Sequence, residues 1–304
     1  MDSITPPAPV AFVGLGVMGG AMAANLLKAG FALTVSSRTR ARAASLEAAG
    51  ARWAESAAAA AKGAALVGIC VPDTADVEAV LFGPQGVAEG AGPGTVVVDF
   101  STISASATAG FAARLREATG AALLDSPVSG GPQGARDGTL TCMVGGDPAA
   151  FARAEPAFRA VGKTLTHLGP PGAGQVCKAA NQLIVAATTL AVAEALALGA
   201  KAGLDGEAMR KALLGGSARS FVLENHAARM LSGSFAPGFR AELMRKDLRL
   251  SAGAMRDHGV FAPATGLVAS MLEALVGSGR GGLDSAAMGA LVREFSGLPD
   301  RGEA

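Results

Sequence analysis

Three glycines at the end of the first apolar run have the spacing of a phosphate-binding turn. Gly14, Gly16 and Gly19 lie in the segment GLGVMG, which follows the run Val10–Val13. A glycine at the first position allows a tight turn, the second lets the backbone approach a pyrophosphate, and the third lets helix and strand pack closely. The strand, turn and helix within about 30 residues favour dinucleotide binding over an ordinary glycine-rich turn. The predicted contacts are Gly14, Leu15, Gly16, Val17, Met18 and Gly19.

The end of the second apolar run lacks the acid that NAD-selective sites usually carry. Such sites place Asp or Glu about 20 residues past the glycines, where it binds the ribose 2′-hydroxyl. Here the chain reads TVSSR up to Arg38, with Arg40 and Arg42 beyond it. A guanidinium can form paired hydrogen bonds with a 2′-phosphate, so we expect NADP to be preferred, or at least accepted as well as NAD. The alternative is that the arginines only begin a solvated helix. The predicted contacts are Ser37, Arg38 and Thr39.

Three longer segments resemble one family of enzymes. They read AFVGLGVMGGAMAANLLKAG, DSPVSGGPQGARDGTLTCMVGG and GAGQVCKAANQ. Together they resemble the β-hydroxyacid dehydrogenases, which include 3-hydroxyisobutyrate dehydrogenases and are similar in fold to 6-phosphogluconate dehydrogenase. The similarity extends from about Ala11 to about Gly297. The resemblance implies hydride transfer between a nicotinamide cofactor and a small β-hydroxy acid or its carbonyl partner.

The resemblance gives the catalytic role to Lys178. A lysine near a nicotinamide can donate a proton to the substrate carbonyl oxygen as hydride arrives, and take it back in the oxidation. Asn181 and Gln182, at i+3 and i+4, would share its helix face; we expect Asn181 to assist catalysis and Gln182 to bind substrate. Many relatives have Asn where this chain has Gln182. Both are neutral amides, so the difference affects the reach of the side chain and the size of the substrate more than the catalytic mechanism. Without the motif, Lys178 would be interpreted as a surface lysine whose stem covers an apolar helix.

The segment Ser129, Gly130 and Gly131 resembles the family's clamp for the substrate carboxylate. Two glycines let a backbone amide come close to an anion, and the serine hydroxyl adds a donor. The alternative is a plain glycine-rich turn. The resemblance therefore predicts substrates with a carboxylate near the reacting carbon.

Four further residues match cofactor-lining positions of the family. They are Val71, Pro72, Thr102 and Lys246. Thr102 follows an apolar run, at the end of a strand where open α/β sheets bind ligands. Asp76 stands where the family often has Asn, so a cofactor contact at this position stays open. The alternative interpretation of Lys246 is that it belongs to a charged helix face with Arg245 and Asp247.

Apolar runs alternate with Ala-rich stretches through the first half of the chain. The predicted strands are Val10–Val13, Ala32–Ser36, Ala65–Val71, Val96–Asp99, Ala122–Asp125, Leu140–Val144 and Lys163–His167. This alternation predicts an α/β domain with a doubly wound, Rossmann-type parallel sheet. From Gln175 onward we expect only helices, led by a long one from about Gly174 to Ala202 that passes between domains. The predicted domains are residues 1–170, binding NAD(P), and residues 171–304, all-helical, for substrate binding and oligomerisation.

Composition narrows the possible partners. With 26 basic and 25 acidic side chains the net charge is +1, which disfavours nucleic acid and anionic membranes as partners.

The amino terminus lacks the basic and apolar pattern of a secretory signal. The uncharged stretch Ala179–Ala193 contains polar residues and is shorter than the ~18–20 apolar residues of a spanning helix, so we expect a buried core helix. Cys70, Cys142 and Cys177 form no CxxC pair, so we expect no disulfide framework, no metal site and a cytoplasmic location.

Together these features predict an NAD(P)H-dependent oxidoreductase for a small carboxylate substrate, assembled as a homodimer or homotetramer. Two alternatives stay open: an imine-reducing relative with another proton donor, and a catalytically inactive dinucleotide-binding module. The presence of Lys178 disfavours both. The sequence does not identify which semialdehyde or keto acid is the substrate, because one methylene group changes the discrimination between substrates by only ~1–3 kcal/mol.

Overall fold

The computed structural model describes residues 2–299, and the chain divides into two compact units. The first unit ends at Lys178 and the second begins at Ala179. This division falls inside one continuous helix, α9 (Ala173–Lys201). The predicted boundary at residue 170 precedes α9, because the sequence pattern changes there, but the first turn of the helix is hydrogen-bonded into the first unit.

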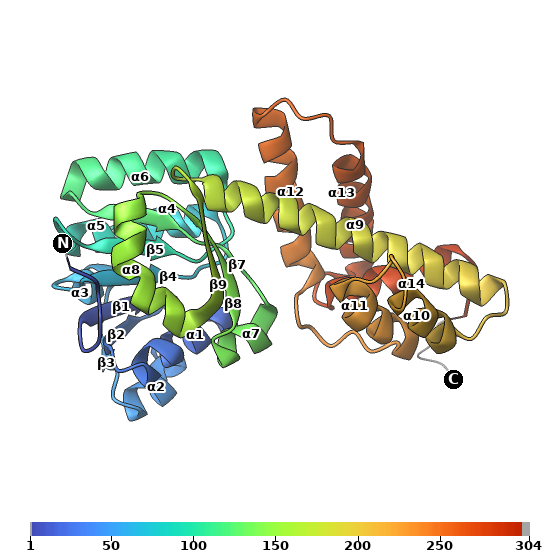
Figure 1. Cartoon of the computed structure of the whole chain (residues 1–304), viewed down its shortest axis with the longest axis horizontal. Coiled ribbons are helices and arrows are strands. Elements are labelled where there is room, and N and C mark those ends of the chain that lie inside the picture. Colours follow the sequence, from blue (N-terminus) through green and yellow to red (C-terminus); the bar gives the residue numbers. More distant parts are fainter. Residues whose placement is uncertain (1, 300–304) are drawn as a thin grey trace. The chain divides into compact units, whose positions relative to one another are not determined.

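A mostly parallel sheet forms the centre of the first unit (Figure 1). Within residues 2–178 its nine strands are β1 (Pro9–Val13), β2 (Ala32–Ser36), β3 (Arg52–Trp53), β4 (Leu66–Ile69), β5 (Val96–Asp99), β6 (Ala122–Asp125), β7 (Val128–Ser129), β8 (Leu140–Gly145) and β9 (Gly162–Gly169). They are ordered β3-β2-β1-β4-β5-β6-β8-β7, with β9 also paired to β8. The order changes direction at β1, so the carboxyl ends of β2 and β4 lie on either side of the glycine-rich turn.

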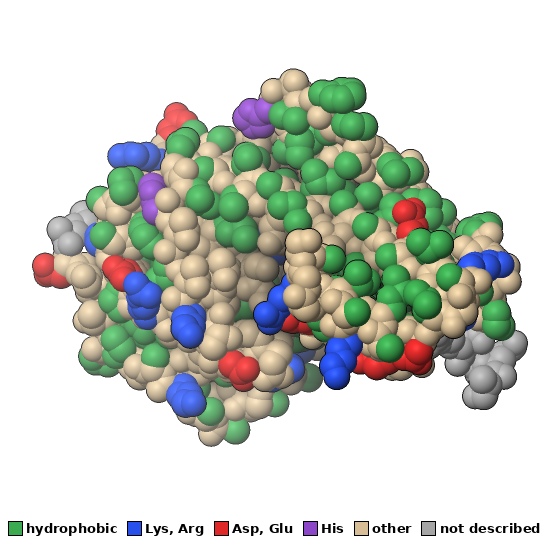
Figure 2. Space-filling model, turned by 45° about the vertical axis from the view of Figure 1, so that its right-hand side comes forward, with side chains coloured by type: hydrophobic (Ala, Val, Ile, Leu, Met, Phe, Trp, Pro, Cys, Tyr) green, Lys and Arg blue, Asp and Glu red, His purple; other side chains and the backbone are tan. Residues whose placement is uncertain are grey.

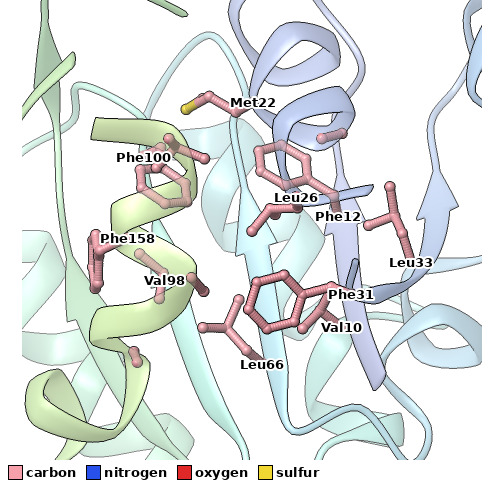
Figure 3. Packing of buried hydrophobic residues seen from close by; sticks show 14 of the residues in the cluster. Val10, Phe12, Met22, Leu26, Phe31, Leu33, Leu66, Val98, Phe100 and Phe158 are labelled. Atoms are coloured by element: carbon pink, nitrogen blue, oxygen red, sulfur yellow. The ribbon is translucent and has the colours of Figure 1, made fainter. Parts of the chain in front are cut away.

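Helices cover both faces of this sheet. They are α1 (Val17–Lys28), η1 (Arg40–Ala43), α2 (Ala44–Ala48), α3 (Ala57–Ala61), α4 (Thr74–Phe82), α5 (Val87–Gly90), α6 (Ala105–Thr119), α7 (Gly131–Asp137) and α8 (Pro148–Val161). Successive residues of a strand point to opposite faces, and β1 contributes to two separate cores. Phe12 packs in one core with Met22 and Phe158, as Figure 3 shows, whereas Ala11 belongs to the other with Leu81. A sheet buried on both faces is what the continuous apolar runs predict.

All seven predicted strands are present, with small shifts at their ends. Two strands were not predicted, β3 and β7, and each is only two residues long. The sheet is also not wholly parallel, because β8 runs antiparallel to β6 and β7. For the β7–β8 pair the connection, residues 130–139, is too short to be a parallel crossover, which needs a dozen residues or more.

The second unit is helical, as predicted. After α9 its helical segments are α10 (Gly206–Leu214), α11 (Phe221–Ser232), α12 (Ala241–Asp257), α13 (Pro263–Leu275), η2 (Val276–Arg280), η3 (Ser285–Ala287) and α14 (Met288–Phe295). Among the described residues beyond Lys201, strand-like pairing is limited to an isolated bridge between Arg240 and Asp284. Two hydrophobic clusters hold these helices together.

Helix α9 contributes to both clusters of the second unit, but it is buried only in part, whereas the sequence predicted a buried core helix. Leu190 lies in one cluster and Leu196 in the other. By length and composition alone α9 could cross a membrane: its most apolar 18-residue window has a mean hydropathy of 2.0 and is 39% buried. Ile184 and Leu198 are 66% and 69% exposed, and hydrophobic side chains occupy much of the visible surface of the helical unit in Figure 2.

Candidate active site

The glycine-rich turn between β1 and α1 contains two positions that exclude any side chain. Gly14 has φ +94°, and a Cβ there would overlap the carbonyl oxygen of Cys70. A Cβ on Gly19 would overlap the carbonyl oxygen of Gly14 and lie 3.1 Å from the Phe12 ring. Both glycines are therefore required by the closeness of β1, β4 and α1.

Gly16 differs from these two glycines because space lies open beside it. It begins α1 with φ −71°, and a Cβ there would meet nothing within 4 Å. The first turn of α1 carries no acidic residue, and no side chain caps its amino end. Backbone N–H groups in a first turn have no partner within the helix, so this turn fits a dinucleotide phosphate. Leu15 is buried and Val17 is 72% exposed.

The loop after β2 presents Arg38 to solvent. Its side chain is 84% exposed, and its Nη1 lies 3.6 Å from Oδ1 of Asp76, in the first turn of α4. Arg40 is held differently, since it pairs with Glu47 at 3.1 Å and lies 5.5 Å over the Trp53 ring. Ser37 and Thr39 flank Arg38, and Thr39 precedes η1. Both side chains are exposed, but Arg40 is held by an ion pair and an aromatic ring, and Arg38 by one ion pair.

The carboxyl ends of β4 and β5 are joined by polar contacts. Ser101 accepts a hydrogen bond from the backbone N–H of Val71 at 3.0 Å, and its own N–H donates to Asp99 at 2.9 Å. This places Val71 next to Ser101, the residue before Thr102. The cofactor contacts of Val71, Pro72 and Thr102 stay predictions. Thr102 is half-buried.

The turn after β7 is formed by two left-handed glycines. Gly130 has φ +131° and Gly131 has φ +63°, conformations that residues with a side chain rarely adopt. A Cβ on Gly130 would lie 3.2 Å from Leu140, whereas one on Gly131 would meet open space. The turn that follows Ser129 therefore depends on glycine at both positions.

Lys178 is buried, with only 7% of its surface exposed. Its Nζ donates to the carbonyl oxygen of Val128 at 2.8 Å, so the ammonium lies next to Ser129. A surface lysine would place its charge in water, and the structure excludes that alternative. The structure therefore brings the predicted proton donor to the predicted carboxylate clamp.

The turn that carries Lys178 is fixed by a buried carboxylate. The two oxygens of Asp125 accept from the backbone N–H groups of Gly172 and Gln175, at 2.8 and 2.9 Å, at the amino end of α9. The Gln175 side chain donates to Ser101 O at 2.8 Å and accepts from Ile103 N at 3.1 Å. Burial raises the pKa of Asp125, and these backbone donors oppose the rise. The start of α9 is thus tied to the ends of β5 and β6.

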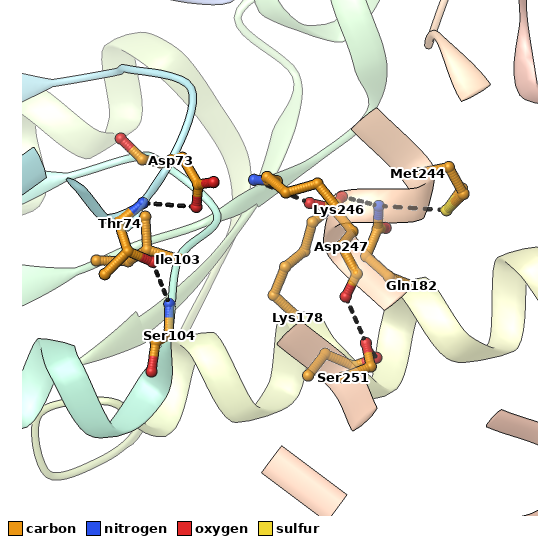
Figure 4. A network of polar contacts seen from close by, with 12 residues as sticks. Asp73, Thr74, Ile103, Ser104, Lys178, Gln182, Met244, Lys246, Asp247 and Ser251 are labelled. Atoms are coloured by element: carbon orange, nitrogen blue, oxygen red, sulfur yellow. Dashed lines mark hydrogen bonds and ion pairs between the residues drawn. The ribbon is translucent and has the colours of Figure 1, made fainter. Parts of the chain in front are cut away.

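In the second unit, a polar network connects α9 to α12 (Figure 4). Gln182 Nε2 donates to Oδ2 of Asp247 at 2.5 Å, and Lys246 Nζ lies 3.1 Å from Oδ1 of the same carboxylate. Gln182 Oε1 accepts from Asn181 Nδ2 at 2.8 Å. The predicted residues Asn181, Gln182 and Lys246 are therefore brought together by Asp247, which is 3% exposed.

The sequence analysis named Asp247 only within the charged helix face that was the alternative for Lys246, and did not predict its place in this network. Lys246 and Asp247 do not form such a face, because Asp247 lies among the buried residues Met244, Leu248 and Ser251 of α12. The spacing of these residues, at i−3, i+1 and i+4, was the available signal for a buried carboxylate.

Comparisons with known proteins match both units. A family profile for the NAD-binding domain of 6-phosphogluconate dehydrogenase covers residues 9–169, and one for NAD binding in NADP-dependent 3-hydroxyisobutyrate dehydrogenase covers residues 172–292. The 2-hydroxy-3-oxopropionate reductase of Escherichia coli K12 is 42% identical, over 91% of this chain and 94% of its own. An NAD-dependent L-serine dehydrogenase of Pseudomonas aeruginosa is 40% identical, over 89% and 93%.

A solved structure resembles the fold over the same range. The 3-hydroxyisobutyrate dehydrogenase of Mycobacterium tuberculosis, solved with L-serine, has a TM-score of 0.86 and 31% identity, covering 93% of this chain and 98% of that one. Similarity in sequence and fold over nearly the whole length makes this chain a member of the β-hydroxyacid dehydrogenases, a family of NAD(P)-dependent oxidoreductases.

Proposed function

We propose that this enzyme reduces tartronate semialdehyde (2-hydroxy-3-oxopropionate), or interconverts 3-hydroxyisobutyrate and its semialdehyde, with Lys178 as general acid and base. The observation that carries the proposal is the buried Lys178 ammonium, 2.8 Å from Val128 O and beside Ser129. The 42% identity to a 2-hydroxy-3-oxopropionate reductase supports the choice of substrate class.

Proton transfer is assigned to the Nζ of Lys178. When bound, the nicotinamide supplies or accepts the hydride. In the reduction, Lys178 gives a proton to the carbonyl oxygen of the substrate, and in the oxidation it takes one from the hydroxyl group. The hydrogen bond to Val128 O orients the ammonium, and Asn181, at i+3 on α9, assists it.

The substrate carboxylate is assigned to Ser129, Gly130 and Gly131. The serine hydroxyl is a donor, and the left-handed glycines keep side chains away from the backbone at this turn. Binding the carboxylate here would hold the reacting carbon close to Lys178, whose Nζ is hydrogen-bonded to the residue before Ser129. A positioned reactant needs no further bimolecular encounter with the proton donor.

We further propose that NADPH is preferred, or used as well as NADH. No acid stands at the end of β2, and Arg38 is 84% exposed there. The proposed assembly is a homodimer or homotetramer formed through the second unit, supported by the exposed Ile184 and Leu198 on α9. A monomeric mass in light scattering at micromolar concentration would contradict that assembly.

A substrate panel tests the proposed reaction. The unmodified enzyme is mixed with NADPH or NADH and with glyoxylate, tartronate semialdehyde, methylmalonate semialdehyde or succinic semialdehyde, and oxidation of the cofactor is followed by absorbance. We expect the highest kcat/KM with tartronate semialdehyde or methylmalonate semialdehyde. A cyclic imine is added to the panel as a fifth compound, and its turnover alone would favour an imine reductase. Binding of cofactor without any turnover would favour an inactive module.

A further inference from the structure

Arg38 and Asp76 connect the loop after β2 to the first turn of α4, on opposite sides of the glycine-rich turn. β2 and β4 both pair with β1 in parallel, one on each side. Arg38 follows β2, and Asp76 lies in the first turn of α4, which follows β4. Their ion pair, at 3.6 Å, therefore passes across the carboxyl end of β1.

This ion pair is exposed, and its arginine can exchange partners. The side chain of Arg38 is 84% exposed and that of Asp76 is 34% exposed, and such pairs are weak in water. Arg40, the first residue of η1, is held more firmly because two carboxylates, those of Glu47 and Glu55, lie 3.1 and 3.6 Å from it. Arg38 is thus the better placed of the two to turn toward an incoming anion.

We infer that Asp76 is a specificity-determining residue that lowers the preference for NADPH by competing with the 2′-phosphate for Arg38. The inference rests on the proposed NADPH preference and adds a residue to it. A phosphate monoester carries about two negative charges at neutral pH. It must draw Arg38 away from Asp76 or share it with that carboxylate, whereas the uncharged 2′-hydroxyl of NADH makes no such demand.

The sign of the effect follows from charge alone. Replacing Asp76 by Asn keeps the size of the side chain and removes the competing negative charge. The dissociation constant for NADPH should then fall roughly two- to fivefold, the size expected of one exposed charge interaction. The constant for NADH should stay within about 1.5-fold of its original value, because no charge is placed beside Arg38.

A matched control lies on the same helix. Glu78 is also acidic and exposed on α4, but its partner is Arg114, at 3.3 Å. Glu78→Gln makes the same change in net charge as Asp76→Asn without releasing Arg38. It should leave the ratio of the two dissociation constants unchanged.

The test measures binding of NADPH and NADH by isothermal titration calorimetry, without any substrate. Four proteins are compared with the unmodified enzyme: Asp76→Asn, Glu78→Gln, Arg38→Ala and the double variant Arg38→Ala with Asp76→Asn. We expect tighter NADPH binding in Asp76→Asn, weaker binding in Arg38→Ala, and no further effect of Asp76→Asn once Arg38 is absent. The gain in Asp76→Asn should also shrink as salt is added.

Unchanged or weaker NADPH binding in Asp76→Asn would overturn the inference. If Arg38→Ala still weakens NADPH binding in that case, the proposed cofactor preference stands and only the role of Asp76 fails. If Arg38→Ala leaves NADPH binding unchanged, the proposed contact fails as well. An equal gain from Glu78→Gln would reduce the effect to net charge and would also overturn the role of Asp76.

Discussion

Gln182 and Asp247 join helices α9 and α12 through a hydrogen bond of 2.5 Å between Nε2 and Oδ2. The other end of the Gln182 amide accepts from Asn181, and the other oxygen of Asp247 faces Lys246. Both ends of the Gln182 amide are therefore engaged, the oxygen by Asn181 and the nitrogen by Asp247. The network therefore couples three predicted site residues to one buried carboxylate.

Asp247→Asn should disturb this whole network. An Asn amide can satisfy either Gln182 or Lys246 but not both in the present geometry, since its nitrogen is a donor. We expect the helical unit to lose about 1–3 kcal/mol of unfolding free energy, measured by urea denaturation, and kcat/KM to fall with it. Glu273→Gln, which alters exposed pairs with Arg245 and Arg249, should change stability by less than about 0.5 kcal/mol. An unchanged denaturation midpoint in Asp247→Asn would show that the carboxylate is dispensable.

Lys178→Ala should remove the proton donor. We expect kcat to fall by ~10²–10⁴-fold, the usual contribution of general acid–base catalysis, with little change in cofactor affinity. Lys201→Ala, at the exposed end of the same helix, is the matched control and should turn over normally. Near-normal kcat in Lys178→Ala would exclude this residue as the catalytic acid.

Gly16→Ala and Gly19→Ala should separate ligand binding from packing. A Cβ on Gly16 meets open space within the protein, so the variant should keep its thermal stability yet bind NADPH at least about tenfold more weakly, as expected if a phosphate contact is lost. A Cβ on Gly19 overlaps Gly14 O, so that variant should be destabilised by about 1–3 kcal/mol. Calorimetry and thermal denaturation distinguish the two, and normal NADPH binding by Gly16→Ala would count against a phosphate at this turn.

Methyl esters of active semialdehydes should be poor substrates. The proposed clamp at Ser129 binds a carboxylate, and a charge-assisted hydrogen bond contributes roughly 1.5–3 kcal/mol. We therefore expect kcat/KM for the ester to fall by about tenfold or more relative to the acid. Equal rates for ester and acid would mean that this turn does not bind the carboxylate.

His226 should make stability fall at acidic pH. Burial lowers the pKa of His226 below its ordinary value of 6.5, against an opposing effect of Asp284. Between the lowered pKa and 6.5 the unfolded chain binds more protons than the folded chain, so stability rises with pH through that window and is lost as pH falls through it. His226→Gln removes this titration while its amide can still donate to Thr189, the partner of His226 at 3.2 Å.

The measurement is the denaturation midpoint of the unmodified protein and of His226→Gln between about pH 8 and pH 5. The unmodified protein should lose more stability than the variant as the pH falls. His258→Gln, at an exposed position, should follow the unmodified protein. Parallel pH profiles for His226→Gln and the unmodified protein would show that His226 does not cause the loss.

The sequence predicted the strands that are long and apolar enough to give a pattern. β3 and β7 were not predicted, because two residues are too few to show a periodicity. The direction of β8 was not predicted either, because it depends on its neighbours in space rather than on its own residues. The glycine turns, Ser129 and Lys178 belong to contiguous motifs and could be predicted. The pairs Gln182 with Asp247 and Arg38 with Asp76 could not, because each joins segments distant in sequence through tertiary folding.

Asp125 caps the amino end of α9, so local unfolding of that end is coupled to unfolding of the sheet. The amides of Gly172 and Gln175 donate to a carboxylate at the end of β6, although they stand at the start of a helix that continues into the second unit. Their hydrogen exchange with solvent should therefore report the opening of the sheet, not of the helices that follow. A fragment beginning at Ala173 would lack this carboxylate, and the start of its helix, from Ala173 to about Lys178, would fray.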